Sequence, residues 1–292
     1  DVLLEDDAEL RAKVRAYALR STSVNAFATD NGIILVNLGL IARAESEAQI
    51  AFILSHELSH YTEQHVFDSY LKNKDLFEGK GNHRNSGTDE RLMALNLYSK
   101  ELEIVADSAA FQRMSKTKYG TSGMLEVFEM LRFAHIPFEN QVFDPAFFSI
   151  DGYKVKPAML LDKVRTPEPF LGGDEDDLTT HPDPNEREKV VMGWLNSYGA
   201  HGGDPFVISE TRFNHIRDLS RKEMVKLYRL ANEPVMAVYS AYTLLKENAD
   251  DYTLKLELAK GLYSIAKNVN HGRKQSIVPD FGNQQGEAQQ LE

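Results

Sequence analysis

The segment HELSH at residues 56–60 decides how the middle of this chain folds and what it can bind. It follows the apolar run IAFIL at residues 50–54, which contains no glycine or proline and predicts a helix. Residues four apart lie on one helix face, so the imidazoles of His56 and His60 project together and can share one metal ion. Glu57 lies at the rim of that face, within reach of a water on the metal.

The pattern His-Glu-x-x-His is the signature of zinc proteases, but it also occurs by chance in other proteins. The surrounding sequence therefore has to supply what a catalytic zinc site needs. Such a site uses three protein ligands and leaves one position open for water or substrate. His56 and His60 supply two of them, and a third has to come from another element.

Glu103 is the candidate third ligand. It lies in the segment LEIVADSAAF at residues 102–111, which predicts a helix rich in small residues that let a second helix approach closely. Asp107 lies one turn further on the same face, where it can accept the spare ring N–H of a ligand histidine and fix its tautomer. The alternative is a solvated helix face. The apolar neighbours favour a buried pair of carboxylates, which needs a metal or a cation.

An HExxH motif followed about forty residues later by ExxAD resembles peptidase family M48, which includes the CAAX prenyl protease type one and the HtpX-like and BepA-like zinc metalloproteases. The resemblance covers about residues 20–200. Three shorter stretches agree with it: Asn25-Ala26-Phe27-Ala28 with Gly32, Gly39-Leu40-Ile41 with Glu47, and Thr180-His181-Pro182 with Arg187.

The resemblance implies a mostly helical α+β fold with a zincin-like (gluzincin) catalytic domain and a small β-hairpin or sheet beside the HExxH helix. It implies one Zn²⁺ per chain and hydrolysis of peptide bonds in proteins. With His56, His60 and Glu103 as ligands, we expect Glu57 to act as general base and then as general acid.

His181 and Arg187 are implicated by the resemblance alone. His181 has two alternative roles: it stabilises the oxyanion of the transition state, or it occupies the open zinc position and keeps the protease inactive, as in BepA-like relatives. Arg187 would hold the loop or the transition-state charge. A third alternative for His181 is a surface histidine before a proline turn.

Proteases bind extended peptides by adding them as a strand to a sheet edge. We therefore expect a substrate edge strand formed by Asn25, Ala26, Phe27 and Ala28, or failing that by Ile33–Asn37. An Asn-Gly pair at residues 31–32 predicts the turn of a hairpin between these two segments.

The rest of the chain predicts a succession of helices. We place them at residues 7–20, 46–72, 92–116, 122–135, 186–198, 221–230, 234–248 and 251–268. We expect a catalytic domain over residues 1–203, a C-terminal helical region over residues 204–270 and a flexible tail over residues 271–292. The C-terminal helices resemble a tetratricopeptide-type hairpin only weakly, and extra helices packed on the catalytic domain are an equal alternative.

Composition limits the partners and the compartment. A net charge of −11 argues against nucleic acid and against an anionic membrane surface. No apolar run approaches the roughly 18 residues of a membrane span. The absence of cysteine excludes disulfides and fits a periplasmic or cell-envelope location in bacteria. Because the chain opens at Asp1 without a methionine, we expect a trimmed chain, which a signal or anchor could have preceded.

Three functions remain open at this point. The first is a zinc-dependent endopeptidase in bacterial cell-envelope protein quality control. The second is a latched or inactive protease that acts as a chaperone or binding module, with a protein partner on its C-terminal helices. The third is a zinc hydrolase that is not a peptidase. Glu57 favours the first function over the second, because an inactive site needs no base.

Overall fold

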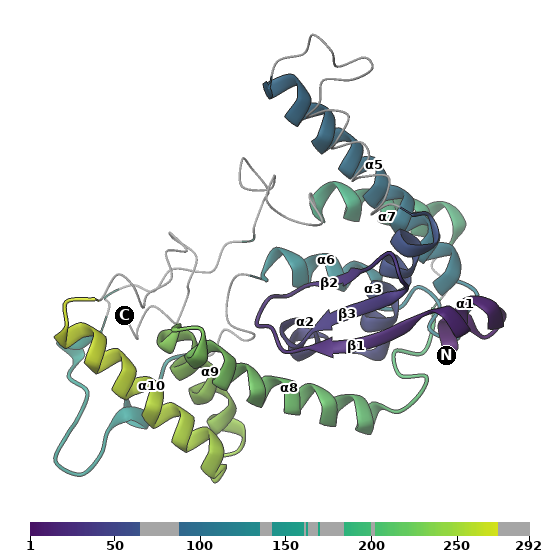
Figure 1. Ribbon diagram of the computed structural model, residues 1–292. Helices are drawn as coiled ribbons and strands as arrows, with labels where there is room; N and C mark the ends of the chain where they lie inside the picture. Colours follow the sequence, from purple (N-terminus) through teal and green to yellow (C-terminus); the bar gives the residue numbers. More distant parts are fainter. Residues whose placement is uncertain are drawn as a thin grey trace.

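The computed structural model describes residues 1–64, 88–134, 142–160, 162, 169, 184–199 and 202–273. Its elements are η1 (Val2–Leu4), α1 (Ala8–Lys13), β1 (Arg15–Leu19), β2 (Ala26–Ala28), β3 (Ile33–Asn37), α2 (Leu38–Arg43), α3 (Glu47–Thr62), α5 (Thr88–Met114), α6 (Met124–Arg132), η3 (Pro145–Phe148), η4 (Pro157–Met159), α7 (Pro184–Tyr198), α8 (Glu210–Leu230), α9 (Pro234–Glu247) and α10 (Tyr252–Asn270). The predicted mostly helical α+β architecture is confirmed (Figure 1).

The three strands form one sheet in the order β1-β3-β2. The predicted hairpin is confirmed, because β2 pairs antiparallel with β3 and aligns Ala28 with Ile34. Its turn uses Gly32, whose φ of +79° favours glycine. β1 pairs parallel with β3 on the opposite side, so β2 and β1 are the two edges of the sheet.

The prediction of one helix over residues 7–20 is wrong in its second half. Helix α1 ends at Lys13, where Val14 turns to an extended conformation, and the next five residues form β1. The pairing of Arg15 through Leu19 with β3 decides this segment. A contact with a strand that lies eighteen positions further along the chain overrides the local helical pattern.

Helix α3 is the centre of the larger hydrophobic core. Its first turn is capped by Ser46, whose Oγ accepts a hydrogen bond from the backbone N–H of Gln49 at 3.2 Å. Phe52 is 1% exposed and belongs to the same cluster as Ile34 and Val36 of the sheet. The sheet therefore packs on one side of the helix that carries the HExxH motif.

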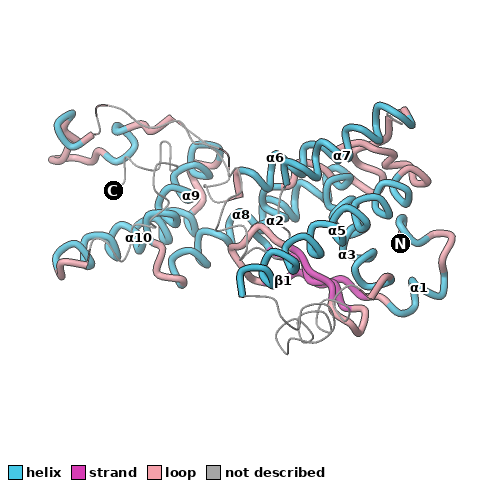
Figure 2. Tube along the Cα trace, turned by 90° about the horizontal axis from the view of Figure 1, so that it is seen from above, coloured by secondary structure: helices cyan, strands magenta, loops and turns pink. Residues whose placement is uncertain are grey.

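Three further helices enclose α3. Helix α5 packs along it, α6 also contacts it, and α7 packs against both α5 and α6. Figure 1 shows α5, α6 and α7 on the side of the sheet where β2 lies, and Figure 2 shows α3 and α5 side by side from above. Helices α5, α6 and α7 thus lie on the same side of the sheet as the edge strand β2.

Two predicted helix boundaries are wrong. The HExxH helix ends at Thr62 instead of residue 72, because Gln64 has a φ of +56°; residues 65–72 lie outside the described part. Helix α8 begins at Glu210 rather than residue 221, and Ser209 caps it by accepting the N–H of Arg212. Glu47 at the start of α3 accepts the backbone N–H groups of Ile208 and Ser209, which fixes where α8 begins.

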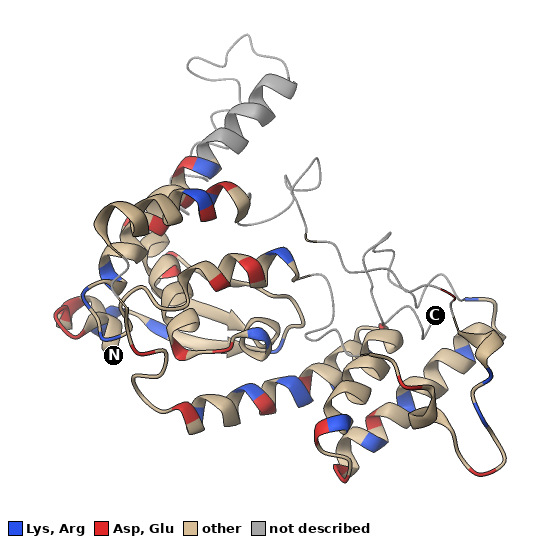
Figure 3. Cartoon of the chain, turned by 180° about the vertical axis from the view of Figure 1, so that it is seen from behind, with Lys and Arg blue, Asp and Glu red and all other residues tan. Residues whose placement is uncertain are grey.

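Helices α8, α9 and α10 form the C-terminal part of the described chain. All residues of α9 from Pro234 to Leu245 are buried, between α8 on one side and α10 on the other. Helix α8 also packs on α2, where Ala42 meets Met224 and Tyr228. Figure 3 shows positions of Lys, Arg, Asp and Glu distributed along α8, as expected of a partly solvated helix. None of the described helices is long and apolar enough to cross a membrane.

Candidate metal centre

Helix α3 places His56 and His60 on adjacent turns of one buried face. The two residues are 4% and 8% exposed, and their Nε2 atoms lie 3.0 Å apart. Their rings meet edge to face, with centroids 4.7 Å apart. The spacing of four residues thus brings two imidazole nitrogens to one point, as predicted from the motif.

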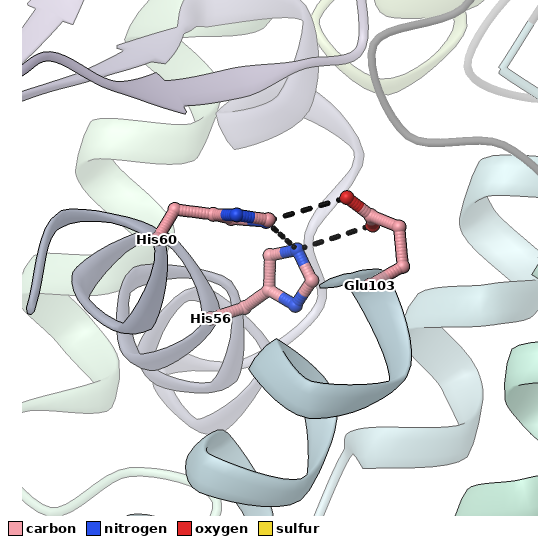
Figure 4. Close-up of side chains that lie close together, drawn as sticks. All are labelled: His56, His60 and Glu103. Atoms are coloured by element: carbon pink, nitrogen blue, oxygen red, sulfur yellow. Dashed lines mark hydrogen bonds and ion pairs between the residues drawn. The ribbon is translucent and has the colours of Figure 1, made fainter. Parts of the chain in front are cut away.

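Helix α5 brings Glu103 to the same point. Its Oε2 lies 3.4 Å from Nε2 of His56, and its Oε1 lies 3.3 Å from Nε2 of His60. Glu103 is 2% exposed. Figure 4 shows the carboxylate of Glu103 facing both rings from the neighbouring helix. Ligand atoms of all three residues lie within 4.8 Å of one another, so these side chains could hold one metal ion.

Asp107 lies one helical turn after Glu103 and contacts the second ring nitrogen of His56. Its Oδ1 lies 2.8 Å from Nδ1 of His56. A carboxylate at Nδ1 favours the tautomer with the proton on that nitrogen and directs the Nε2 lone pair toward the other ligands. Burial alone would lower the pKa of His56, but the carboxylates of Asp107 and Glu103 outweigh it and raise the pKa to about 10.

Arg187 of α7 forms the back of the site. Its Nε and Nη2 bond the two carboxylate oxygens of Asp107, each at 2.8 Å, and its Nη1 lies 2.8 Å from Oε2 of Glu103. Burial would raise the pKa of Asp107, but Arg187 and then His56 outweigh it and lower the pKa to about 2. The same carboxylates raise the pKa of Arg187 against the effect of burial.

The side chain of Glu57 contacts the sheet. It is 3% exposed, and its Oε2 accepts a hydrogen bond from the backbone N–H of Ala28 at 2.9 Å. The bond comes from the outer side of β2, because the neighbouring Thr29 N–H points inward to the carbonyl of Ile33. The sequence did not predict this contact, because a hydrogen bond donated by a main-chain amide leaves no motif in the sequence.

The predicted substrate strand of Asn25, Ala26, Phe27 and Ala28 occupies an edge of the sheet, as β2 and the residue before it. The side chain of Asn25 accepts the backbone N–H of Ala26 at 2.9 Å. The fallback prediction, an exposed edge at Ile33–Asn37, is wrong, because β3 lies between β1 and β2. His181 lies outside the described residues, so its position relative to the ligands is untested.

The donor set and the charge of the site both suit a divalent cation. Two imidazoles and a carboxylate are the ligands of many catalytic zinc sites. Glu57, Glu103 and Asp107 are three buried carboxylates, and Arg187 is the one buried guanidinium beside them in the described part of the site. A dication at the ligands would balance the remaining negative charge of these carboxylates.

Comparison with known proteins agrees with this geometry. The model of Peptidase family M48 matches residues 3–195, about two thirds of the chain. The chain belongs to peptidase family M48. The family match covers α3, α5 and all but the last residues of α7, the helices that carry the HExxH motif, Glu103 and Arg187.

A curated relative adds a more specific likeness over a short stretch. The putative beta-barrel assembly-enhancing protease of Vibrio cholerae serotype O1 is 34% identical over 50 residues. These cover 17% of this chain and 10% of that protein. The aligned stretch thus spans about a tenth of the relative, and the family, rather than this relative, indicates a peptidase.

Proposed function

We propose that this chain is a zinc-dependent endopeptidase that hydrolyses peptide bonds in proteins. The observation that carries the proposal is the convergence of His56, His60 and Glu103 from two helices on one point. Zinc bound there would supply a Lewis acid for the scissile carbonyl and lower the pKa of a bound water. Membership of a peptidase family supports this chemistry over other hydrolase reactions.

Residues of the protein would transfer the proton, orient the base and balance the charge of the ligands. Glu57 takes the proton of the attacking water and passes it to the leaving amine. Ala28 holds one oxygen of that carboxylate, so the base is oriented before substrate arrives. Asp107 keeps His56 in the ligating tautomer, and Arg187 balances the charge of Asp107 and Glu103.

In this proposal Arg187 acts through its neighbours. Its side chain is 6% exposed, and its guanidinium nitrogens pair with both Asp107 and Glu103. A group held in this way positions the ligands and does not reach the substrate. This argues against the predicted direct bond of Arg187 to the transition state. Its contacts with Asp107 and Glu103 were not predicted, and the loop before α7 lies outside the described residues.

The substrate would bind as an extended strand along β2. Its scissile bond would lie beside the ligands, because Ala28 at the end of β2 already bonds Glu57. The biological setting we propose is protein quality control in the bacterial cell envelope or periplasm. The resemblance to BepA-like proteases and the name of the Vibrio cholerae relative support it.

A second candidate is a latched protease that acts as a binding module through α8–α10. The observation in its favour is a set of exposed apolar side chains on α10, including Tyr252, Leu256 and Tyr263. The oriented carboxylate of Glu57 favours the active enzyme instead, because a binding module has no need of a positioned base.

One experiment tests the first proposal. Purified protein is analysed for metal, and its digestion of casein is measured before and after removal of metal with a chelator. We expect one zinc per chain, loss of digestion in the chelated sample and its return when zinc is added. Digestion that persists in metal-free protein would contradict the proposal, and zinc binding without digestion would favour the binding module.

A further inference from the structure

Helix α3 carries a second pair of polar side chains at the spacing of its ligands. Ser55 and Ser59 each precede one of the two histidines, and both serines are fully buried, with 0% exposure. The hydroxyl of Ser59 donates to the carbonyl oxygen of Ser55 at 2.9 Å. Successive residues on a helix are about 100° apart, so the serine pair faces a different direction from the histidine pair.

Arg113 of α5 meets this serine pair. Its Nη1 lies 3.0 Å from the carbonyl oxygen of Ser55, 3.2 Å from Oγ of Ser55 and 3.3 Å from Oγ of Ser59. One guanidinium nitrogen thus bonds both the backbone and the side chains of α3. Nη1 carries two N–H groups, so the three acceptors share them, and the planar guanidinium fixes the plane in which these bonds lie.

These bonds create a second point of attachment between the two ligand-bearing helices. At the first point, Glu103 and Asp107 of α5 face the histidines of α3. The second lies six residues beyond Asp107, on the same helix. Packing in the shared core holds α5 against α3, and the two polar attachments add directional contacts that define the register of the helices.

Arg113 is partly buried, and the acceptors of its Nη1 include no carboxylate. Burial lowers its pKa, and the more distant carboxylates of Asp7 and Glu63 offset this in part. The three oxygens that its Nη1 meets are neutral. Removing a cation from water without an adjacent counter-ion is unfavourable unless hydrogen bonds replace its hydration.

We propose that Arg113 is a positioning residue for the metal centre. It fixes the register of α3 against α5 and thereby the distance from His56 and His60 to Glu103. The inference rests on the proposed function, in which these three side chains hold zinc.

The test is the zinc affinity of Arg113→Met, measured by competition with a chromophoric chelator. Methionine keeps much of the apolar stem and removes the guanidinium. We expect zinc to bind about 10- to 100-fold more weakly, the scale seen when groups that orient metal ligands are removed. Arg113→Lys should recover part of the loss. Gln112→Ala, at the exposed neighbouring position of α5, should bind zinc as the wild type does.

A second set of variants separates positioning from general stability. Ser55→Ala with Ser59→Ala should weaken zinc binding in part, because it removes the two hydroxyl acceptors and leaves the bond to the backbone carbonyl of Ser55. Adding Arg113→Met should then cost less than it costs in the wild type, because two of its bonds are already absent. Should Arg113→Met fail to fold, Arg113→Lys and the serine variants decide the question. Unchanged zinc affinity with a lower melting temperature would overturn the inference alone. Wild-type protein that binds no zinc would overturn the proposed function and this inference with it.

Discussion

The backbone N–H of Ala28 donates a 2.9 Å hydrogen bond to Oε2 of Glu57, so the edge strand and the HExxH helix are joined at the proposed base. The strand that would bind a peptide therefore also orients the carboxylate that would act on it. Because β2 would hold both the peptide and the carboxylate of Glu57, the reacting groups would stay in a productive geometry.

Glu57→Gln should separate metal binding from chemistry. The amide keeps the size of the side chain but cannot accept the proton, so peptidase activity should fall by at least about 100-fold. Zinc content should remain one per chain, because Glu57 is not a ligand. The matched control is Glu101→Gln, the same change at an exposed position of α5, which should leave both quantities unchanged. A mutant that retains wild-type turnover would show that Glu57 is not the base.

Backbone pairing of substrate with β2 predicts an alternating effect of N-methylation along a peptide substrate. Each methyl group removes one amide donor, and only every second amide of a strand faces its neighbour. Each sensitive position should lose about 1 kcal/mol, or about fivefold in kcat/KM, and the positions between them provide the control. Equal sensitivity at all positions, or at none, would count against strand addition.

Arg187→Met should destabilise the protein strongly. It leaves the buried carboxylates of Asp107 and Glu103 without their guanidinium, and breaking a buried ion pair in this way costs about 3–5 kcal/mol. Urea unfolding of metal-free protein measures the change. Lys189→Met lies on the exposed side of the same helix and should have little effect. A similar stability of the two variants would show that the ion pairs contribute no net stabilisation.

His181→Ala distinguishes the two roles predicted for this histidine. If His181 occupies the open zinc position at rest, its removal should raise peptidase activity. If it stabilises the transition state, activity should fall by about 100- to 1000-fold, the scale of one lost oxyanion donor. We expect an increase, because a long acidic segment with two glycines precedes His181 in the sequence. Unchanged activity would show that neither role holds.

The sequence predicted best where spacing alone carries the information. The four-residue separation of His56 and His60 puts their rings on one helix face whatever surrounds them. The hairpin also follows from a local signal, the Asn-Gly turn. Glu103 could be chosen as a ligand because its helix contains small residues and its neighbours are apolar.

The contacts that the sequence did not reveal are long-range or involve the backbone. Residues 15–19 form β1 only because β3 lies beside them, so their own pattern misled the prediction. The bond from Ala28 to Glu57 starts at a main-chain amide, which every residue except proline carries. The reach of Arg113 to Ser55 depends on a side-chain conformation that no spacing encodes.

The order of the strands has a practical consequence for handling this protein. β3 separates β2, which lies beside the ligands, from β1, which follows the first helix of the described chain (Figure 1). A fluorophore or surface tether attached at Tyr17, an exposed residue of β1, would therefore lie on the opposite side of the sheet from the proposed peptide-binding edge. Immobilised protein could be loaded with substrate from its exposed side, and single-molecule assays could hold the chain there without obstructing turnover.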